Sequence, residues 1–145
     1  MSSTGGAERA RPGHHPTDGS AELWLDPEGN TVFRSPCTLR IQANAIDYTW
    51  SHEDQDQQGR LTVEASGATW RDSWHQPEPA ACAHVPDATG LFTVQHTYGP
   101  GWCWRTTLSE RPDGNIVLQM TNLAPGGEEG RAVRMVFTPG GASTK

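Results

Sequence analysis

Ten residues, from Ala68 to Pro77, carry more chemistry than any other short stretch of this chain, and they read A-T-W-R-D-S-W-H-Q-P. Trp70, Asp72 and Trp74 are spaced by two. On a β-strand, whose side chains alternate between faces, all three would point the same way. The glycine before this segment and the prolines after it leave under three helical turns, which favours a strand. The spacing predicts a carboxylate on an otherwise aromatic face, and such a carboxylate is a candidate for acid–base chemistry.

Two histidines are candidates for the same proton-transfer chemistry. His96 occupies an inward position of the strand predicted over residues 91–99. His75 alternates with Asp72 and is expected on the opposite face, at the rim or exterior, although a register slip of one residue would exchange these positions. The candidate catalytic residues are therefore Asp72 and His96, with His75 ranked below them. Burial among indole rings would raise the pKa of Asp72 unless Arg105 or His96 lies near it.

Short alternating segments, separated by turn residues, extend along most of the chain and would position these side chains. Residues 61–65 and 102–108 alternate between apolar and polar, and Arg111-Pro-Asp-Gly114 is a strong turn signal. The segment His52–Gly59 is expected to be a polar, acidic loop. Residues 78–87 are expected to form an irregular connection with a short edge strand. In all, the pattern contains eight to ten strands and no convincing helix.

This succession of short strands and turns predicts an all-β fold, namely a single antiparallel β-barrel of about 8–10 strands. Such a barrel has an interior just wide enough for one small ligand. The barrel domain is expected over residues 21–138, with a turn at Pro27–Asn30. Residues 1–20 and residues 139–145 are expected to be a disordered N-terminal arm and a disordered tail, because their composition cannot bury a core.

With the apolar faces turned inward, the interior combines aromatic rings with few polar groups, which is the profile of a small-molecule site. The residues expected to bind a ligand are Tyr48, Trp50, Trp70, Trp74, Tyr98, Trp102, Trp104, Arg105, Met120 and Asn122. The alternative is that the tryptophans only fill the barrel, with Asp72 and His96 bonded to ring N–H and O–H groups. Six tryptophans are many for filling alone, because each large ring needs matched small neighbours.

Composition disfavours several classes of function. The formal net charge of −6 makes nucleic acid and anionic membranes poor partners, and Lys145, the single lysine, does not suit Schiff-base chemistry. Three widely spaced cysteines match neither a disulfide framework nor a zinc motif, and reduced thiols are expected. Asp54 and Asp56 imitate the start of a calcium loop, but Ala65 stands where its bidentate glutamate belongs. We expect no metal and no cofactor.

The sequence has no apolar run long enough to span a membrane and no signal-peptide core after Met1. The expected location is the cytoplasm, and the expected assembly is a monomer or a homodimer. The expected partner is a small-molecule ligand or substrate.

Four motifs resemble those of a family of small uncharacterised bacterial proteins. They are Tyr48-Thr-Trp50, the W-R-D-S-W-H run at residues 70–75, Gly101-Trp-Cys-Trp-Arg105, and Met120-Thr-Asn122 before Pro125-x-x-Glu-Glu129. The resemblance covers roughly residues 45–137 and implies a lipocalin-like, calycin-type β-barrel with a cavity. Cys103 departs from the pattern, since a small residue such as glycine is expected there. The family carries no settled activity, and a fold alone does not give a function.

Three functions from different classes are compatible with these residues. The first choice is a protein that binds an apolar or aromatic small molecule in an aromatic-lined cavity. The second is a small cofactor-independent enzyme, a cyclase, an isomerase or a lyase, that uses a buried Asp/His pair for proton transfer. A haem binder, with His96 or His75 as axial ligand, is the third. A serine nucleophile is disfavoured, because Ser73 has no elbow glycines around it.

Overall fold

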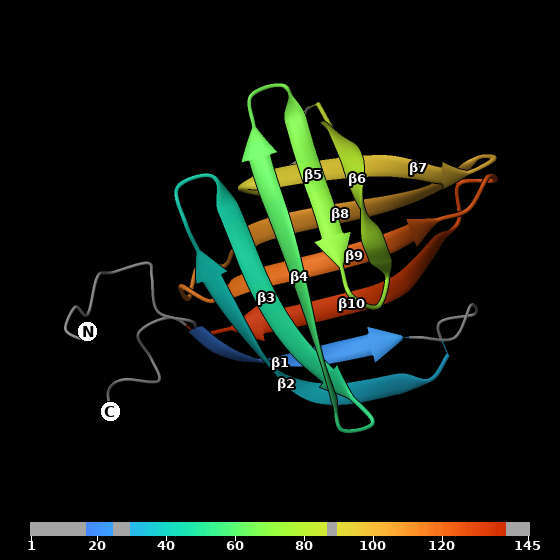
Figure 1. The fold of residues 1–145 in the computed structure, drawn as a ribbon. Helices are drawn as coiled ribbons and strands as arrows, with labels where there is room; N and C mark the ends of the chain where they lie inside the picture. The colour runs from blue at the N-terminus through green and yellow to red at the C-terminus, as the bar shows by residue number, and fades with distance from the viewer. Residues whose placement is uncertain (1–16, 25–29, 87–89, 139–145) are drawn as a thin grey trace.

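The computed structural model describes residues 17–24, 30–86 and 90–138, which form one closed antiparallel barrel of ten strands (Figure 1). The strands are β1 (Thr17–Trp24), β2 (Val32–Ile41), β3 (Ala45–His52), β4 (Gln55–Glu64), β5 (Gly67–Asp72), β6 (Gln76–His84), β7 (Phe92–Gly99), β8 (Trp102–Glu110), β9 (Ile116–Leu123) and β10 (Glu129–Phe137). Each strand pairs with the next along the chain, and β1 pairs with β10 to close the ring. The expected single all-β barrel, consistent with a calycin-type architecture, is confirmed.

Alternate residues of the strands turn inward and form one core, as the alternating sequence requires. The largest fully buried side chains are Trp50, Trp70, Tyr48, Phe137, Leu23, Leu39, Leu61, Leu118, Met120, Met135, Val94 and Val133. These side chains come from most of the strands, so the burial of apolar surface in one common core holds the barrel together. Among the described residues, no helix is long and apolar enough to cross a membrane.

The first strand begins at Thr17, four residues before the expected domain boundary. Gly19 pairs with Phe137, and a side chain at Gly19 would meet the carbonyl oxygen of Val136 at 2.2 Å. The glycine thus permits the close approach of β1 to β10 that closes the ring. Residues 1–16, the tail from residue 139 and most of the turn predicted at 27–30 lie outside the described residues.

The acidic loop expected at His52–Gly59 is instead a tight turn followed by the first half of β4, so that prediction was wrong. Glu53 and Asp54 adopt positive φ angles of 52° and 63°, which is the conformation of a two-residue hairpin turn. His52 therefore pairs directly with Gln55, and the polar run after it continues as a strand.

The irregular connection expected at residues 78–87 was also wrong, because β6 is a nine-residue strand over Gln76–His84. It pairs with β5 along most of its length, but with β7 only at Ala83–Gln95 and His84–Val94 in the described register. Pro77 and Pro79 lie in the first half of β6, where they have no backbone N–H to donate. The ring of strands therefore has one short seam, between β6 and β7.

Candidate functional site at the aromatic end of the barrel

Four exposed aromatic side chains gather at one end of the barrel. They are Phe33 (40% exposed), Trp74 (45%), Tyr98 (50%) and Trp102 (38%). Neighbouring strands run antiparallel, so the first residues of β2 and β8 lie at the same end as the last residues of β5 and β7. We call this the aromatic end. Large apolar side chains exposed together mark a site of interaction more often than singly exposed ones do.

A continuous series of ring contacts leads from this exposed end into the core. In order, the rings are Phe33, His52, Trp74, Trp50, His75, Trp104, Trp70, His96, Tyr98 and Trp102, and successive ring centroids are 4.7 to 6.4 Å apart. Trp70 and Trp104 are stacked at 5.3 Å with their planes 14° apart. We call these ten residues the ring cluster. It gives the barrel a wall of aromatic faces that passes from solvent to the core.

The chain turns immediately after Asp72, and this turn decides which side chains enter the cluster. The expected strand over residues 70–75 ends at Asp72, so Trp74 lies exposed at the rim and not inside. His75, expected outside, instead swings inward, where its side chain is 12% exposed and its ring lies between Trp50 at 5.6 Å and Trp104 at 5.1 Å. Both placements were wrong because alternation does not continue through a turn.

The side chain of Asp72 itself holds this turn. Its Oδ1 accepts the backbone N–H groups of Trp74 and His75, each at 2.8 Å, and lies 3.3 Å from Nδ1 of His75. An aspartate that bonds the backbone two residues on is a common turn former. Asp72 is therefore inside the barrel, as predicted, and it also positions His75.

The second oxygen of Asp72 is engaged as well. The Tyr48 hydroxyl donates to Oδ2 at 2.6 Å, and Trp70 Nε1 donates to the Tyr48 oxygen at 2.9 Å. Burial raises the pKa of Asp72, but the contacts with His75, the Tyr48 hydroxyl and the backbone of His75 outweigh it, so the pKa falls below its ordinary value. Asp72 is thus a charged group whose oxygens are occupied by the protein. It suits a positioning role better than direct contact with a ligand.

Gly59 makes the Tyr48–Asp72 contact possible. Tyr48 pairs with Gly59 and Gly59 pairs with Asp72, so the three form one row across β3, β4 and β5. A Cβ atom at Gly59 would lie 2.1 Å from Cζ and 2.2 Å from the hydroxyl oxygen of Tyr48. The tyrosine ring therefore crosses β4 over the glycine to reach the carboxylate. Sequence reasoning missed this role, although a lone glycine within a polar strand is a signal of close approach.

His96 lies on the other side of the cluster. Its ring is 5.6 Å from Trp70 and 6.1 Å from Tyr98, and its Nδ1 is 4.0 Å from the Cys82 thiol. Burial lowers the pKa of His96, which favours the neutral imidazole. His96 makes no hydrogen bond or ion pair with Asp72 in the described part of the chain, so the expected Asp72–His96 pair is replaced by Asp72–His75.

Four ring nitrogens of the cluster are buried without a hydrogen-bond partner among the described residues. They are Trp50 Nε1, Trp104 Nε1, His75 Nδ1 and His96 Nε2. Oδ1 of Asp72 lies 3.3 Å from His75 Nδ1, but the contact does not have the geometry of a hydrogen bond. A buried polar group left unpaired costs about 1 to 3 kcal/mol. The concentration of these four nitrogens in one cluster indicates that they have a role other than packing the core.

The remaining predicted ligand-binding residues divide between the interior, the rim and the outer face. Met120 is buried and Trp104 packs half-buried against the core. Tyr98 is at the rim, where its hydroxyl donates to Asn122 Oδ1. Arg105 extends from the opposite face of β8 to Gln95 and Glu129, so the structure does not bring it to the cluster.

The remaining reactive side chains either lie apart from the ring cluster or have a pKa raised by burial, which keeps them protonated. All three cysteines are free thiols, and burial raises the pKa of Cys37 to about 12 and of Cys82 to about 11. Within the described ranges, no three His, Cys, Asp or Glu side chains lie together as a metal ion would require.

Comparison of the chain with protein-family models, with curated proteins and with solved structures found no match. The family resemblance drawn from the tryptophan motifs therefore stays a prediction, and the function has to be argued from the site itself.

Proposed function

We propose that the protein binds a small, flat organic molecule at the aromatic end, and that this molecule carries hydrogen-bond acceptors. The observation that carries the proposal is the set of unpartnered ring nitrogens in the ring cluster. An indole N–H can only donate, so the complementary group on the ligand must accept. Aromatic walls with a few converging polar groups are typical of small-molecule sites.

The position of the two unpartnered indoles makes this proposal more specific. Trp50 and Trp104 both lie against the His75 ring, within 5.6 Å between centroids. Trp50 is 2% exposed, so its N–H is well removed from bulk solvent. An acceptor such as a carbonyl or carboxylate oxygen beside His75 would satisfy donors that are otherwise unpaired, while aromatic carbons of the ligand contact exposed Trp74 and Trp102.

A matched pair of probes tests this proposal. We expect 2-naphthoate to quench tryptophan fluorescence with an affinity about three- to tenfold higher than 2-methylnaphthalene, the same ring without acceptors. Trp50→Phe and Trp104→Phe keep a ring but remove the N–H, and each should abolish most of this difference. Trp24→Phe is the control, because Trp24 contacts Arg131 on the outer face of β1. If all three variants behave alike, the indole N–H groups do not select the ligand.

A second candidate function, proton transfer on a bound carbonyl compound, is favoured by the Asp72–His75 contact. Nδ1 of His75 is buried against the carboxylate, so the 12% of this side chain that is exposed belongs to its other atoms. The negative charge of the carboxylate beside Nδ1 favours the tautomer with the proton on Nδ1, which leaves Nε2 available as a base. In this proposal His75 is the proton acceptor and Asp72 is the residue that positions it.

Hydrogen–deuterium exchange tests the second function without knowledge of the natural substrate. In D₂O, the wild-type protein should accelerate exchange of the methyl protons of 2-acetylnaphthalene, followed by NMR. His75→Gln should slow the catalysed exchange by roughly a hundredfold, within the range of general-base catalysis, while His96→Gln should change it little. Binding measured by fluorescence serves as the control for occupancy. Equal loss in both variants, or no acceleration by the wild type while the probe binds, would reject this function and leave the binding proposal standing.

A further inference from the structure

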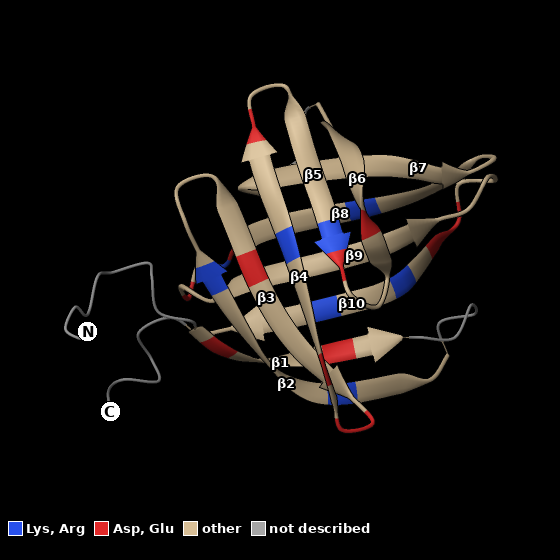
Figure 2. Ribbon diagram, viewed as in Figure 1, with Lys and Arg blue, Asp and Glu red and all other residues tan. Residues whose placement is uncertain are grey.

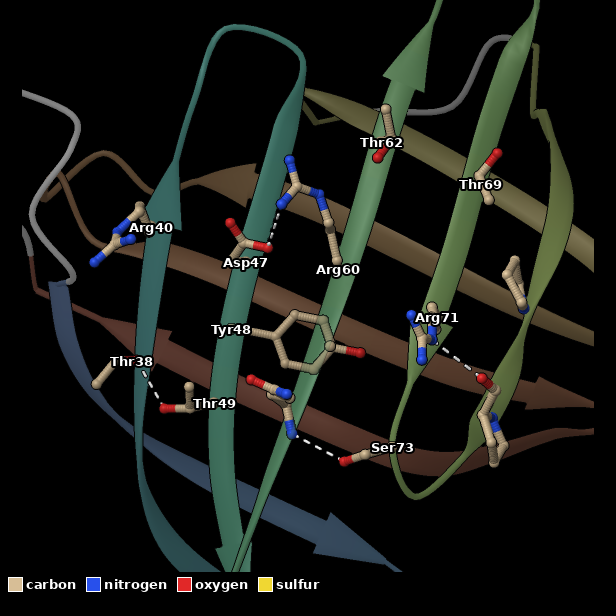
Figure 3. Close-up of a pocket in the computed structure, with 14 residues that line it drawn as sticks. Thr38, Arg40, Asp47, Tyr48, Thr49, Arg60, Thr62, Thr69, Arg71 and Ser73 are labelled. Carbon is tan, nitrogen blue, oxygen red and sulfur yellow. Dashed lines mark hydrogen bonds and ion pairs between the residues drawn. The ribbon is translucent and has the colours of Figure 1, made fainter.

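A shallow groove lies on the outer face of β2 to β6, on the opposite side of the sheet from the ring cluster (Figure 3). Its walls are outward-facing residues of five consecutive strands and of the turn after β5, namely Thr38, Arg40, Asp47, Thr49, Gln58, Arg60, Thr62, Thr69, Arg71, Ser73, Pro77 and Pro79, with Tyr48 and Gly59 in its floor. Apart from the two prolines and the tyrosine ring, this lining is polar. It therefore differs in chemistry from the aromatic end.

One row of charged side chains crosses the groove. In the strand register Arg40 pairs with Asp47, Asp47 with Arg60, and Arg60 with Arg71. Figure 2 shows the same row as basic segments on β2, β4 and β5 with an acidic segment on β3 between them. Three arginines and one aspartate leave the row with two unbalanced positive charges, in a chain whose formal net charge is −6.

The two arginines on β4 and β5 stand directly opposite each other, and like charges in that position destabilise a sheet. Arg60 leans away toward Asp47, with Nη1 and Oδ1 3.4 Å apart, and Arg71 donates its Nε to the Pro77 carbonyl at 3.1 Å (Figure 3). No carboxylate lies within ion-pair distance of Arg71 among the described residues. An anion bound between Arg60 and Arg71 would remove this repulsion.

Two hydroxyl groups complete the arrangement. Thr62 pairs with Thr69 two residues further along the same face, and neither hydroxyl makes a hydrogen bond in the part of the chain that the structure describes. Cross-strand neighbours are about 5 Å apart and residues i and i+2 about 7 Å apart along a strand. The two guanidinium groups and the two hydroxyls thus surround an area about the size of one tetrahedral oxyanion. The arginine side chains are long and flexible enough to reach an anion bound there.

We propose that this groove binds a phosphate group, either as inorganic phosphate or as a phosphate monoester. A phosphate dianion matches the two unbalanced charges of the row, and guanidinium groups bind phosphate oxygens with paired hydrogen bonds. The Thr62 and Thr69 hydroxyls supply two further donors. This site is separate from the aromatic end and does not depend on the function proposed there.

Titration of the full chain followed by ¹H–¹⁵N NMR tests the proposal, with inorganic phosphate and phenyl phosphate as the two probes and sodium chloride holding the ionic strength constant. We expect saturable shifts at the amides of residues 60–62 and 69–71. Tighter binding of phenyl phosphate would identify a monoester as the ligand, and tighter binding of inorganic phosphate would identify the free ion. Phosphate should also raise the melting temperature above the value in chloride of equal ionic strength.

Arg71→Gln should weaken phosphate binding by about tenfold, because it removes a charged partner of the anion. Arg60→Gln is the second variant, since it leaves the contact between Arg71 and Pro77 intact if the first variant folds poorly. Arg34→Gln is the matched control, because Arg34 is an exposed arginine of β2 that faces Glu22. Shifts that grow linearly without saturation, or equal affinity in all three variants, would overturn the proposal.

Discussion

Replacing Asp72 with alanine is expected to lower the free energy of unfolding by about 3 to 5 kcal/mol, because it removes one partner of a buried, charged network. The Tyr48 hydroxyl and the N–H groups of Trp74 and His75 would all lose their acceptor inside the barrel. Chemical denaturation of the variant and the wild type measures the change. Asp47→Ala is the control, since Asp47 faces Arg60 on the outer surface, and its loss should cost under about 1 kcal/mol. Equal effects at the two positions would contradict this account.

The same carboxylate predicts a pH dependence of stability. The folded pKa of Asp72 lies below its ordinary value, so the charged form contributes stability that is fully present above the unfolded pKa, about 3.9. That contribution is lost as the pH falls through the folded pKa. The melting temperature of Asp72→Asn, which does not titrate, should therefore fall less than that of the wild type between pH 5 and pH 2. Parallel curves would show that Asp72 is not a source of acid sensitivity.

Gly59→Ala is expected to lower the free energy of unfolding by about 2 to 4 kcal/mol, because overpacking adds to the loss of a buried hydrogen bond. The new methyl group would occupy the space of the Tyr48 ring and push its hydroxyl away from Asp72. Gly130→Ala is the matched control in β10, where the nearest atom to a new Cβ is 3.7 Å away. The free energy of unfolding of this control should remain within about 1 kcal/mol of the wild-type value. An equal loss in both variants would mean that the two glycines act only through the conformational freedom of the backbone.

A double-mutant cycle would locate the effect in the Tyr48–Asp72 contact. Gly59→Ala and Asp72→Asn both act on that hydrogen bond, so their combined effect should be smaller than the sum of the single effects. Near-perfect additivity would indicate that the Gly59 methyl group is accommodated without moving the tyrosine hydroxyl.

Much of the barrel follows from alternation along the chain. The spacing of Tyr48 and Trp50, and of Trp70 and Asp72, correctly predicts four inward positions, because buried and exposed side chains alternate along β3 and β5 as far as these residues. The position of the strand ends does not follow from alternation. Asp72 ends its strand by bonding the next two backbone N–H groups, and this local chemistry reverses the expected orientations of Trp74 and His75.

The two proposed sites differ in how many of their residues the sequence alone predicts. Because tryptophan is rare, its positions single out Trp74 and Trp102 at the aromatic end, and three further residues of the ring cluster, as candidates. The Arg60–Arg71 pair has no such signal, because residues eleven apart become neighbours only through the register of β4 on β5. That register is set by the two-residue turn at Ala65–Ser66, across which Glu64 pairs with Gly67.

The short seam between β6 and β7 has a consequence for how the barrel moves. In a closed ring, opening any seam costs the hydrogen bonds of that seam, and here the described register gives β6 and β7 only two paired positions, both far from the aromatic end. The first half of β6 can therefore swing outward at a lower free energy than global unfolding requires. Such a local opening would give a ligand a lateral path to the ring cluster while the other nine strands stay in place.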